Sequence, residues 1–411
     1  MVHKSVSIGA YVYPGWHSCP ERDCHFSPGW SEWDLVLNAP SRFPDHNQPR
    51  LPADGKYDDS DPSTAQKQVG MACEYGVDFF VYGFFWSRGK RVFEAALDNG
   101  FLGKDGGGDF PFALMWANRM PRGVLPVKHK PDPGIDPGRL VYTDPDDFVE
   151  LIKFLEERYF SRSNYLRIDG MPLFSIFDST FFLRQLGPSL ASLAIYKAKD
   201  YLIKKGYTGL HLMAINPAPS MIAEFKRSGF DSISHYVWLP DWKGEYRQDY
   251  GKLVKKRSRD WEGFADKSGL TYFPSVSPGW DATPRAATNG YHKQERYPWW
   301  PVVVNEDPAL FSDFLGQAIR YTRKFNKPQL SFIASWNEWS EGHYLEPDER
   351  FGTAWLETVR KPDVVAYAVK PGPLELSNHR RRRIDGHNME TGVSFLNKIV
   401  FSFVDCQGRQ T

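Results

Sequence analysis

Two carboxylates stand close together in the C-terminal third of the chain, where Glu338 and Glu341 alternate with tryptophans. They follow an apolar run over residues 329–334 that is typical of a buried strand. Because successive residues of a strand point to opposite faces, two glutamates three positions apart converge only if the chain turns between them. Ser340 and Gly342 favour such a turn. It would bring the two carboxyl groups to within about 5 Å, the separation expected of a retaining glycosidase.

This arrangement suits acid/base chemistry on a sugar, which needs one protonated and one ionised carboxyl group. Two neighbouring carboxylates separate their own titrations, because the second ionises less easily beside the first. Apolar walls such as Trp336 and Trp339 would raise the pKa of the buried member further. The competing interpretation is a hydrophilic loop with solvated glutamates and scaffold tryptophans. We favour the chemistry, because a loop without a ligand has little reason to gather aromatic side chains around paired acids.

The elements that position this pair follow a repeating pattern of strand and helix along the chain. Short apolar or β-branched runs, each typical of a strand, occupy residues 6–13, 78–84, 110–116, 172–177, 209–215, 231–236, 271–276 and 330–335. Helical patterns lie between most of these runs, and three open with Asp-Pro, at residues 61–62, 144–145 and 307–308. Apolar stripes at helical spacing predict helices over residues 188–205 and 308–324.

The alternation predicts an α/β fold, a single (β/α)8 TIM barrel with long βα loops. We expect the barrel to occupy residues 1–372 and residues 373–411 to form a C-terminal tail. A doubly wound sheet is the alternative, but no G-x-G-x-x-G motif follows any predicted strand. Two loops are longer than a barrel needs. Residues 14–60 predict a lid over one side of the barrel opening, and the aromatic residues within 281–306 predict a surface that stacks on sugars.

Polar and aromatic side chains follow the predicted strands, at the end where the active sites of barrel enzymes lie. We therefore expect a polar and aromatic cleft of the kind that a carbohydrate prefers. Its candidate substrate-binding residues are Tyr11, Tyr13, Trp86, Trp116, Asn118, Asp178, His235, Tyr236, Trp280, Asp281, Trp336, Asn337 and Trp339. Asp178 has a second interpretation, because an aspartate after a strand often caps the next helix.

The motifs around these residues resemble those of WbsX-type proteins, which are related to the endo-α-mannosidases of glycoside hydrolase family 99. Glu-Trp-Ser-Glu-Gly at 338–342 continues into Tyr-Leu-Glu-Pro-Asp at 344–348. Further matches are Tyr-Val-Tyr-Pro at 11–14 with the stretches 29–33 and 43–49 behind it, Trp-Ala-Asn at 116–118, and Ser-Pro-Gly-Trp-Asp-Ala-Thr-Pro-Arg at 277–285. Together they span roughly residues 8–360. They add Trp33, His46, Tyr344 and Glu346 to the expected substrate-binding residues.

The resemblance implies a retaining glycoside hydrolase that acts on a glycan or polysaccharide. In family 99 the first glutamate of the motif deprotonates the 2-hydroxyl of the substrate, which then attacks the anomeric carbon and forms an anhydro sugar. The second glutamate acts as acid and afterwards as base. By position, Glu338 would assist the 2-hydroxyl and Glu341 would be the general acid/base.

Two other functions stay open. One is a glycosyltransferase of polysaccharide biosynthesis, since WbsX-type proteins often carry that label. A metal-dependent transferase would want an Asp-x-Asp motif, and Asp59-Ser60-Asp61 is the local match, although a helix cap is also expected there. The other is a non-catalytic glycan-binding barrel, against which the presence of both glutamates argues.

Composition narrows the expected partners. The formal net charge is +1, which argues against nucleic acid or an anionic membrane as the main partner. No apolar run approaches the roughly 20 residues of a transmembrane helix, and the N-terminal residues lack the apolar centre of a signal peptide. We expect a cytoplasmic protein, or a secreted or periplasmic one if a leader was removed. Its partner would be an oligosaccharide or polysaccharide, with no cofactor and no metal; the oligomeric state is left open.

Overall fold

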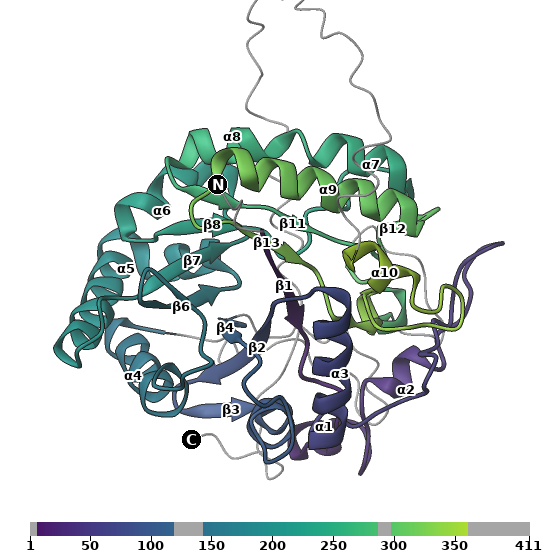
Figure 1. Cartoon of the computed structure of the whole chain (residues 1–411), viewed down its shortest axis with the longest axis horizontal. Coiled ribbons are helices and arrows are strands. Elements are labelled where there is room, and N and C mark those ends of the chain that lie inside the picture. The colour runs from purple at the N-terminus through teal and green to yellow at the C-terminus, as the bar shows by residue number, and fades with distance from the viewer. Residues whose placement is uncertain (1–5, 119–142, 287–296, 361–411) are drawn as a thin grey trace, which may run out of the picture.

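Parallel strands surround one apolar interior in the computed structural model, which describes residues 6–118, 143–286 and 297–360 (Figure 1). The strands of this barrel are, in chain order, β1 (Ser7–Val12), β2 (Phe79–Ser87), β4 (Phe112–Trp116), β6 (Met171–Ile176), β7 (His211–Ile215), β8 (Ser232–Ser234), β10 (Thr271–Phe273) with β11 (Ser275–Val276), and β13 (Leu330–Ile333). Each strand pairs in parallel with the next, and β13 pairs with β1. Every predicted strand is present, so the predicted (β/α)8 barrel is confirmed.

The ring of strands is interrupted at one place, Pro274. This residue separates β10, which pairs with β8, from β11, which pairs with β13. Proline has no backbone N–H to donate to a ladder, so the seventh strand of the barrel divides there. Its carbonyl oxygen still accepts from the Phe332 amide at 2.9 Å. The two halves together therefore close the barrel.

Helices cover the outside of the barrel between consecutive strands, as Figure 1 shows. They are α3 (Pro62–Tyr75), α4 (Pro145–Leu155), α5 (Ser179–Lys204), α6 (Ile222–Ser228), α7 (Tyr250–Arg257), α8 (Asp260–Ser268), α9 (Pro308–Phe325) and α10 (Ala354–Arg360). The three predicted Asp-Pro starts are confirmed, because Asp61, Asp144 and Asp307 each accept a hydrogen bond from a backbone amide of the first helical turn. These caps set where α3, α4 and α9 begin.

Helix α5 begins earlier than predicted. Asp178 caps it by accepting from the Phe181 amide at 2.8 Å, so the segment before residue 188 is helical too. The helix is broken at Gly187, whose φ of 74° and ψ of 156° are not helical. Pro188 cannot continue the hydrogen-bonding pattern of the preceding turn, and glycine tolerates the reversal of direction that results. The predicted start at residue 188 therefore describes only the second half of α5.

Shorter elements lie in the connections. They are α1 (Pro20–His25), α2 (Trp33–Val36), β3 (Lys90–Val92), β5 (Arg167–Ile168), β9 (Arg247–Asp249), β12 (Val302–Val304), β14 (Asn337–Glu338) and β15 (His343–Tyr344). β12 pairs with β9 in parallel, and β14 pairs with β15 in an antiparallel hairpin. Within the described ranges, no helix is both long and apolar enough to cross a membrane.

Aromatic rings fill the interior of the barrel. Phe332 of β13 lies 5.5 Å from the Tyr11 ring, 5.8 Å from the Phe79 ring and 6.1 Å from the Phe273 ring, measured between centroids. Gly9 makes room for this packing, because a Cβ there would lie 2.1 Å from the Phe79 ring. Much of the aromatic content is thus core, as in other barrels where the interior is packed rather than open.

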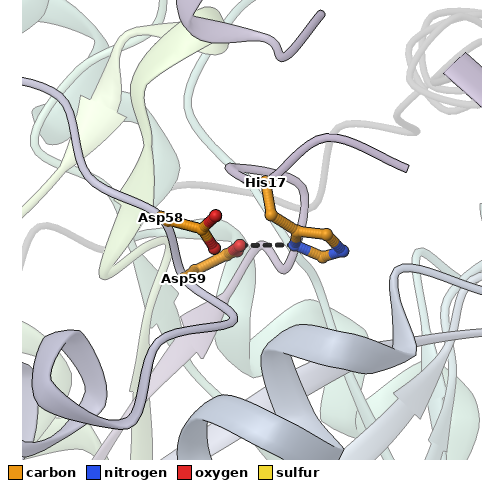
Figure 2. A group of neighbouring side chains, drawn as sticks. All are labelled: His17, Asp58 and Asp59. Carbon is orange, nitrogen blue, oxygen red and sulfur yellow. Dashed lines mark hydrogen bonds and ion pairs between the residues drawn. The ribbon is translucent and has the colours of Figure 1, made fainter. Parts of the chain in front are cut away.

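The two long loops, over residues 14–60 and 281–306, differ in what holds them in place. Residues 14–60 contain α1 and α2, and Nδ1 of His17 donates to Asp59 at 2.6 Å, which joins the two ends of this loop (Figure 2). In the described part of the second loop, Tyr297 and Trp299 are buried, and Trp300 packs on Tyr246 with centroids 5.2 Å apart. These rings pack against the barrel rim, so the predicted stacking surface is wrong for the described part of residues 281–306.

Candidate active site

The two glutamates lie on one tight turn at the C-terminal end of β13. A 3₁₀ turn over Trp339–Glu341 connects β14 to β15, and Gly342 follows in the left-handed region with φ of 67°. The Glu341 carbonyl accepts from the Asp281 amide at 2.7 Å, and a Cβ at Gly342 would lie 2.9 Å from that same amide nitrogen. Glycine is therefore required both by the backbone conformation and by the close approach. The turn predicted from Ser340 and Gly342 is confirmed.

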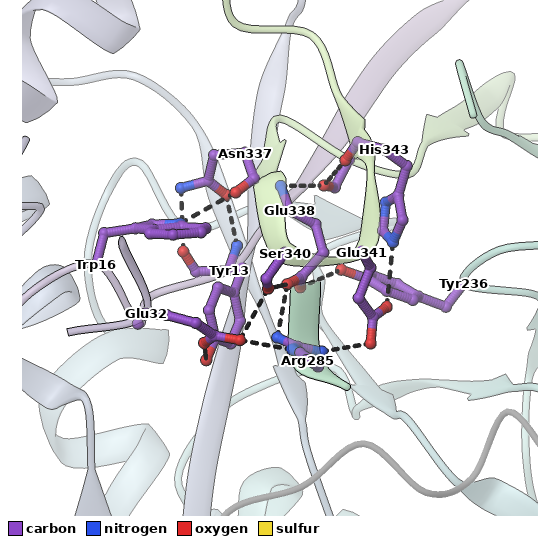
Figure 3. A network of polar contacts seen from close by, with 12 residues as sticks. Tyr13, Trp16, Glu32, Tyr236, Arg285, Asn337, Glu338, Ser340, Glu341 and His343 are labelled. Carbon is purple, nitrogen blue, oxygen red and sulfur yellow. Dashed lines mark hydrogen bonds and ion pairs between the residues drawn. The ribbon is translucent and has the colours of Figure 1, made fainter. Parts of the chain in front are cut away.

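Glu338 and Glu341 both point at the guanidinium of Arg285 (Figure 3). Nη2 of Arg285 donates to Glu338 at 2.9 Å, and Nη1 donates to Glu341. The exposed fractions of the two glutamates are 2% and 0%. We call Glu338 and Glu341 the glutamate pair. Because both carboxylates bind one planar guanidinium through different nitrogens, the two carboxyl groups lie close together.

Glu341 sits among hydrogen-bond donors. Its Oε1 accepts from Arg285 and from the Tyr297 hydroxyl, the latter at 2.7 Å, and Nε2 of His343 lies 3.2 Å from its Oε2. Burial lowers the pKa of His343 despite the neighbouring carboxylate, so this imidazole is neutral. A cation, a phenol and an imidazole therefore surround the Glu341 carboxylate.

Glu338 shares the Arg285 guanidinium with Glu341. Besides Arg285, its carboxylate accepts from the Ser340 hydroxyl at 3.2 Å and the Tyr236 hydroxyl at 3.3 Å. Burial raises the pKa of Glu338 well above its usual range, and the negative charge of Glu341 adds to the effect, although Arg285 opposes it. The raised pKa favours the protonated form of Glu338.

Glu32 is a third buried carboxylate in this network, and sequence reasoning missed it. Its Oε1 accepts from Nε of Arg285 at 2.5 Å and from the Ser340 hydroxyl at 2.8 Å, while Arg22 and the Tyr13 hydroxyl donate to its Oε2. Burial alone would raise its pKa, but the charges of Arg285 and Arg22 outweigh burial and lower it to about 2. Glu32 thus orients the arginine that binds the glutamate pair.

Replacing Glu32 with glutamine should destabilise the protein by roughly 3–5 kcal/mol at neutral pH, because two buried guanidinium groups lose their shared anion. The folded pKa of Glu32 lies below the ordinary 4.5, so its stabilising contribution is complete above pH 4.5 and disappears as the pH falls towards 2. Urea denaturation across this range measures the difference between the wild type and the variant. A difference that persists unchanged in acid would mean that the charge of Glu32 is not its origin.

The structure brings several predicted site residues to the glutamate pair. Tyr13 joins the network through Glu32, and Tyr236 reaches Glu338 directly. Trp280 stacks on His343 with centroids 5.5 Å apart and planes inclined by 10°. Asn337 fixes the end of β1 to the turn, since its Oδ1 accepts from the Tyr13 amide at 2.8 Å and its Nδ2 donates to the Tyr13 carbonyl at 3.0 Å.

Other predicted residues support the turn from behind. Trp336 and Trp339 both donate their indole N–H groups to Glu346, and Tyr344 stacks on Trp339 with centroids 3.7 Å apart. Trp33 packs on the other side of Trp339 at 6.1 Å. These side chains are buried, and they hold the turn in place.

The side chains of the remaining predicted residues have other partners. Nε2 of His46 lies 2.8 Å from the Asp281 carboxylate, and this contact connects the loop over residues 14–60 to the residues that follow β11. Asn118 bonds the backbone of Asp178, which is itself a helix cap. The rest are buried in packing contacts: Tyr11 on Phe332, Trp86 on Phe154, Trp116 on Phe148, and His235 on Trp238 and Phe264.

Three side chains that could bind a metal ion lie together in the loop over residues 14–60, although the sequence predicted no metal site. His17, Asp58 and Asp59 place one possible ligand atom each within 4.8 Å of one another (Figure 2). Asp59 also accepts from the Trp16 amide at 3.1 Å, and Asp58 bonds Ser60. Sequence reasoning could not find this group, because His17 is far from the two aspartates along the chain.

If the glutamate pair hydrolyses a glycoside, turnover should survive a chelator, because two carboxyl groups can carry out that chemistry without a Lewis acid. Turnover of a glycoside before and after incubation with EDTA measures this. Loss of turnover that a divalent ion restores would instead make His17, Asp58 and Asp59 a functional metal site.

The fold resembles that of a solved glycoside hydrolase family 99 barrel. The structure aligns with the GH99 endo-alpha-mannosidase from Bacteroides thetaiotaomicron at a TM-score of 0.56 and 16% identity, over 89% of this chain and 98% of that chain. A solved structure described as a glycoside hydrolase-like protein gives the same TM-score of 0.56 at 16% identity, over 88% and 95% of the two chains. At this identity, the similarity establishes the fold.

The chain belongs to the Glycosyltransferase WbsX family, whose model matches residues 8–359. Uncharacterized protein WxcX from Xanthomonas campestris pv. campestris, strain B100, is 28% identical over 397 residues, which cover 89% of this chain and 51% of that protein. The same protein from strain ATCC 33913 gives the same values. The chain therefore spans about half the length of these curated relatives. The resemblance to WbsX-type proteins and to family 99 is confirmed.

Proposed function

We propose that the protein is a retaining glycoside hydrolase that acts on a glycan or polysaccharide. The observation that carries this proposal is the glutamate pair on one turn at the C-terminal end of a barrel strand, with both carboxylates directed at Arg285. Two carboxyl groups that flank one site are the minimum equipment for hydrolysis of a glycosidic bond. The family 99 fold supports the same class of reaction.

The proposed mechanism uses the 2-hydroxyl of the substrate. Glu338 takes the proton of this hydroxyl while O2 attacks the anomeric carbon, and Glu341 gives a proton to the departing glycosidic oxygen. Water then attacks the anomeric carbon, giving its proton to Glu341, as the anhydro ring opens and O2 recovers its proton from Glu338. Two displacements at one carbon give net retention.

The protonation state of Glu338 must change before this reaction begins. In the absence of substrate, burial raises the pKa of Glu338, whereas the mechanism needs Glu338 ionised and Glu341 protonated. Arg285 donates to both carboxylates of the glutamate pair. A bound sugar that donates its 2-hydroxyl to Glu338 would favour the ionised form of that carboxyl group.

The second candidate is a glycosyltransferase, which the family description favours. A transferase that binds its nucleotide sugar through a metal ion would need acidic residues near the barrel opening to bind that ion. Asp59 and Asp61 of the Asp-x-Asp motif are both engaged, since Asp59 pairs with His17 and Asp61 caps α3. Asp61 is thus a helix cap, whereas Asp59 also belongs to the group with His17 and Asp58, so the chelator experiment decides between the hydrolase and a metal-dependent transferase.

A panel of glycans, incubated with and without nucleotide sugars, tests the proposal. Release of reducing sugar in the absence of nucleotide is the expected result, and NMR of the first product should show the anomer of the substrate. Product that forms only with a nucleotide sugar would establish the transferase. Binding of a glycan without turnover under either condition would leave a glycan-binding barrel.

A further inference from the structure

Glu346 is the centre of a second buried cluster, directly behind the turn that carries the glutamate pair. Its exposed fraction is 4%, and it accepts hydrogen bonds from four side chains. Oε1 accepts from Nε2 of Gln68 at 2.7 Å and from the Trp336 indole at 3.1 Å. Oε2 accepts from the Tyr57 hydroxyl at 2.8 Å and from the Trp339 indole at 2.7 Å. Each oxygen thus serves one indole and one other donor.

The two indoles stand on either side of Glu338 in the chain. Trp336 and Trp339 are fully buried, and an indole N–H can only donate, so each needs an acceptor. Glu346 supplies that acceptor to both, and its amide returns to the Trp336 carbonyl at 3.2 Å. The backbone that carries Glu338 is therefore fixed on both sides by one carboxylate.

We propose that Glu346 is a positioning residue: as an anion it holds both indoles and so sets the position of Glu338 in the glutamate pair. It does not contact the reacting sugar. This inference rests on the proposed function for its effect on turnover, whereas the hydrogen bonds themselves can be measured without a substrate.

Several titratable groups surround Glu346. Burial raises its pKa to about 7, and its hydrogen-bond donors oppose that shift. Tyr57 and Tyr82 face it, and the pKa of each is raised first by burial; the charges of Glu346 and Asp59 add to the effect on both. Gln68 and the two indoles are neutral, so the nearby charge besides Glu346 belongs to Asp59, which pairs with His17.

Replacing Glu346 with glutamine should lower kcat by about 10²-fold with little change in KM, since a displacement of about 1 Å at a catalytic group has that effect. The amide nitrogen must take the place of either Oε1 or Oε2, and in both positions it faces an indole N–H. Gln68 and Tyr57 can reverse their roles and accept, but an indole cannot. One tryptophan therefore always loses its partner, whichever way the amide is oriented.

NMR of protein with ¹⁵N-labelled tryptophan measures the chemical shifts of the indole N–H groups. These shifts would not depend on Glu346 if this residue only contacted the substrate. In the wild type, two indole N–H signals should titrate together with a midpoint of about 7. In Glu346→Gln, one of these signals should shift and neither should titrate. Glu346→Asp keeps the charge and should recover part of the turnover. Unchanged indole signals in a folded Glu346→Gln variant, or a variant defect in KM alone, would overturn the proposal.

Two further variants separate positioning from general stability. Glu156→Gln is the control, because Glu156 is another glutamate that accepts from side chains, here two tyrosine hydroxyls at 3.3 and 3.2 Å, but it lies on the outer helix layer. This variant should leave turnover and the indole signals unchanged. If Glu346→Gln does not fold, Gln68→Met removes one donor and keeps the anion, so the midpoint of the indole titration should rise. A midpoint that stays in place would overturn the proposal. Absence of turnover in the wild type would instead refute the proposed function and leave the NMR result to stand.

Discussion

Glu341→Gln is expected to abolish turnover of natural glycosides while leaving glycan binding largely intact. Glutamine keeps the shape of the side chain and can still accept from Arg285 and Tyr297, but it cannot protonate the departing oxygen. General acid catalysis typically contributes about 10²–10⁴-fold, so kcat should fall by about that factor. The measurement is steady-state kinetics on a natural glycoside beside a binding isotherm for the same ligand.

The leaving group identifies the role of Glu341. An aryl glycoside with a good leaving group needs little protonation, so the Glu341→Gln variant should retain much more activity on it than on the natural glycoside. Equal losses on the two substrates would remove Glu341 from the acid role. If the good leaving group rescues Glu338→Gln instead, the two glutamates exchange roles, in agreement with the raised pKa of Glu338 in the absence of substrate.

Glu338→Gln should depress turnover regardless of the leaving group, by a factor similar to that at Glu341, because no proton passes from Glu338 to the departing oxygen. Its proposed task is to accept the proton of the 2-hydroxyl. A 2-deoxy substrate should therefore bind and not turn over with the wild-type protein. Kinetics with matched 2-hydroxy and 2-deoxy substrates test this.

The stereochemistry of the product tests the same step independently. The attacking 2-hydroxyl must lie trans to the leaving group, as it does in an α-mannoside, and the two displacements return the original configuration. NMR of the first-formed sugar distinguishes the outcomes. An inverted product would refute both the anhydro-sugar route and the close approach of the two carboxyl groups.

The strands and their order could be predicted from the sequence because each is a short local pattern. An apolar run such as the one that becomes β13 is readable by itself, and the Asp-Pro starts at 61–62, 144–145 and 307–308 place helices through contacts of two or three residues. The break of the seventh strand at Pro274 is equally local. Two elements differ from the prediction. A cap at Asp178 extends α5 and Gly187 interrupts it, and the strand predicted over residues 271–276 is divided into β10 and β11.

The environments of the carboxylates could not be predicted in this way, because the pKa of a charged side chain depends on the groups around it. Glu32, Glu338, Glu341 and Glu346 are chemically identical in the sequence, yet two arginines lower the pKa of Glu32 to about 2, and burial raises that of Glu346 to about 7. Asp281 accepts from His46 and Gln48, which lie more than 230 positions away in the chain. No local pattern distinguishes these environments.

The sequence alone determined the barrel, the turn between Glu338 and Glu341, and the family, since each depends on residues close together in the chain or on motifs in a fixed order. Tertiary structure alone decided which groups surround the turn. Arg285 meets Glu32 across 253 positions of the chain, and Gln68 meets Glu346 across 278. Electrostatic and hydrogen-bonding energies depend on distances in space, and only the closed barrel brings these side chains within reach of one another.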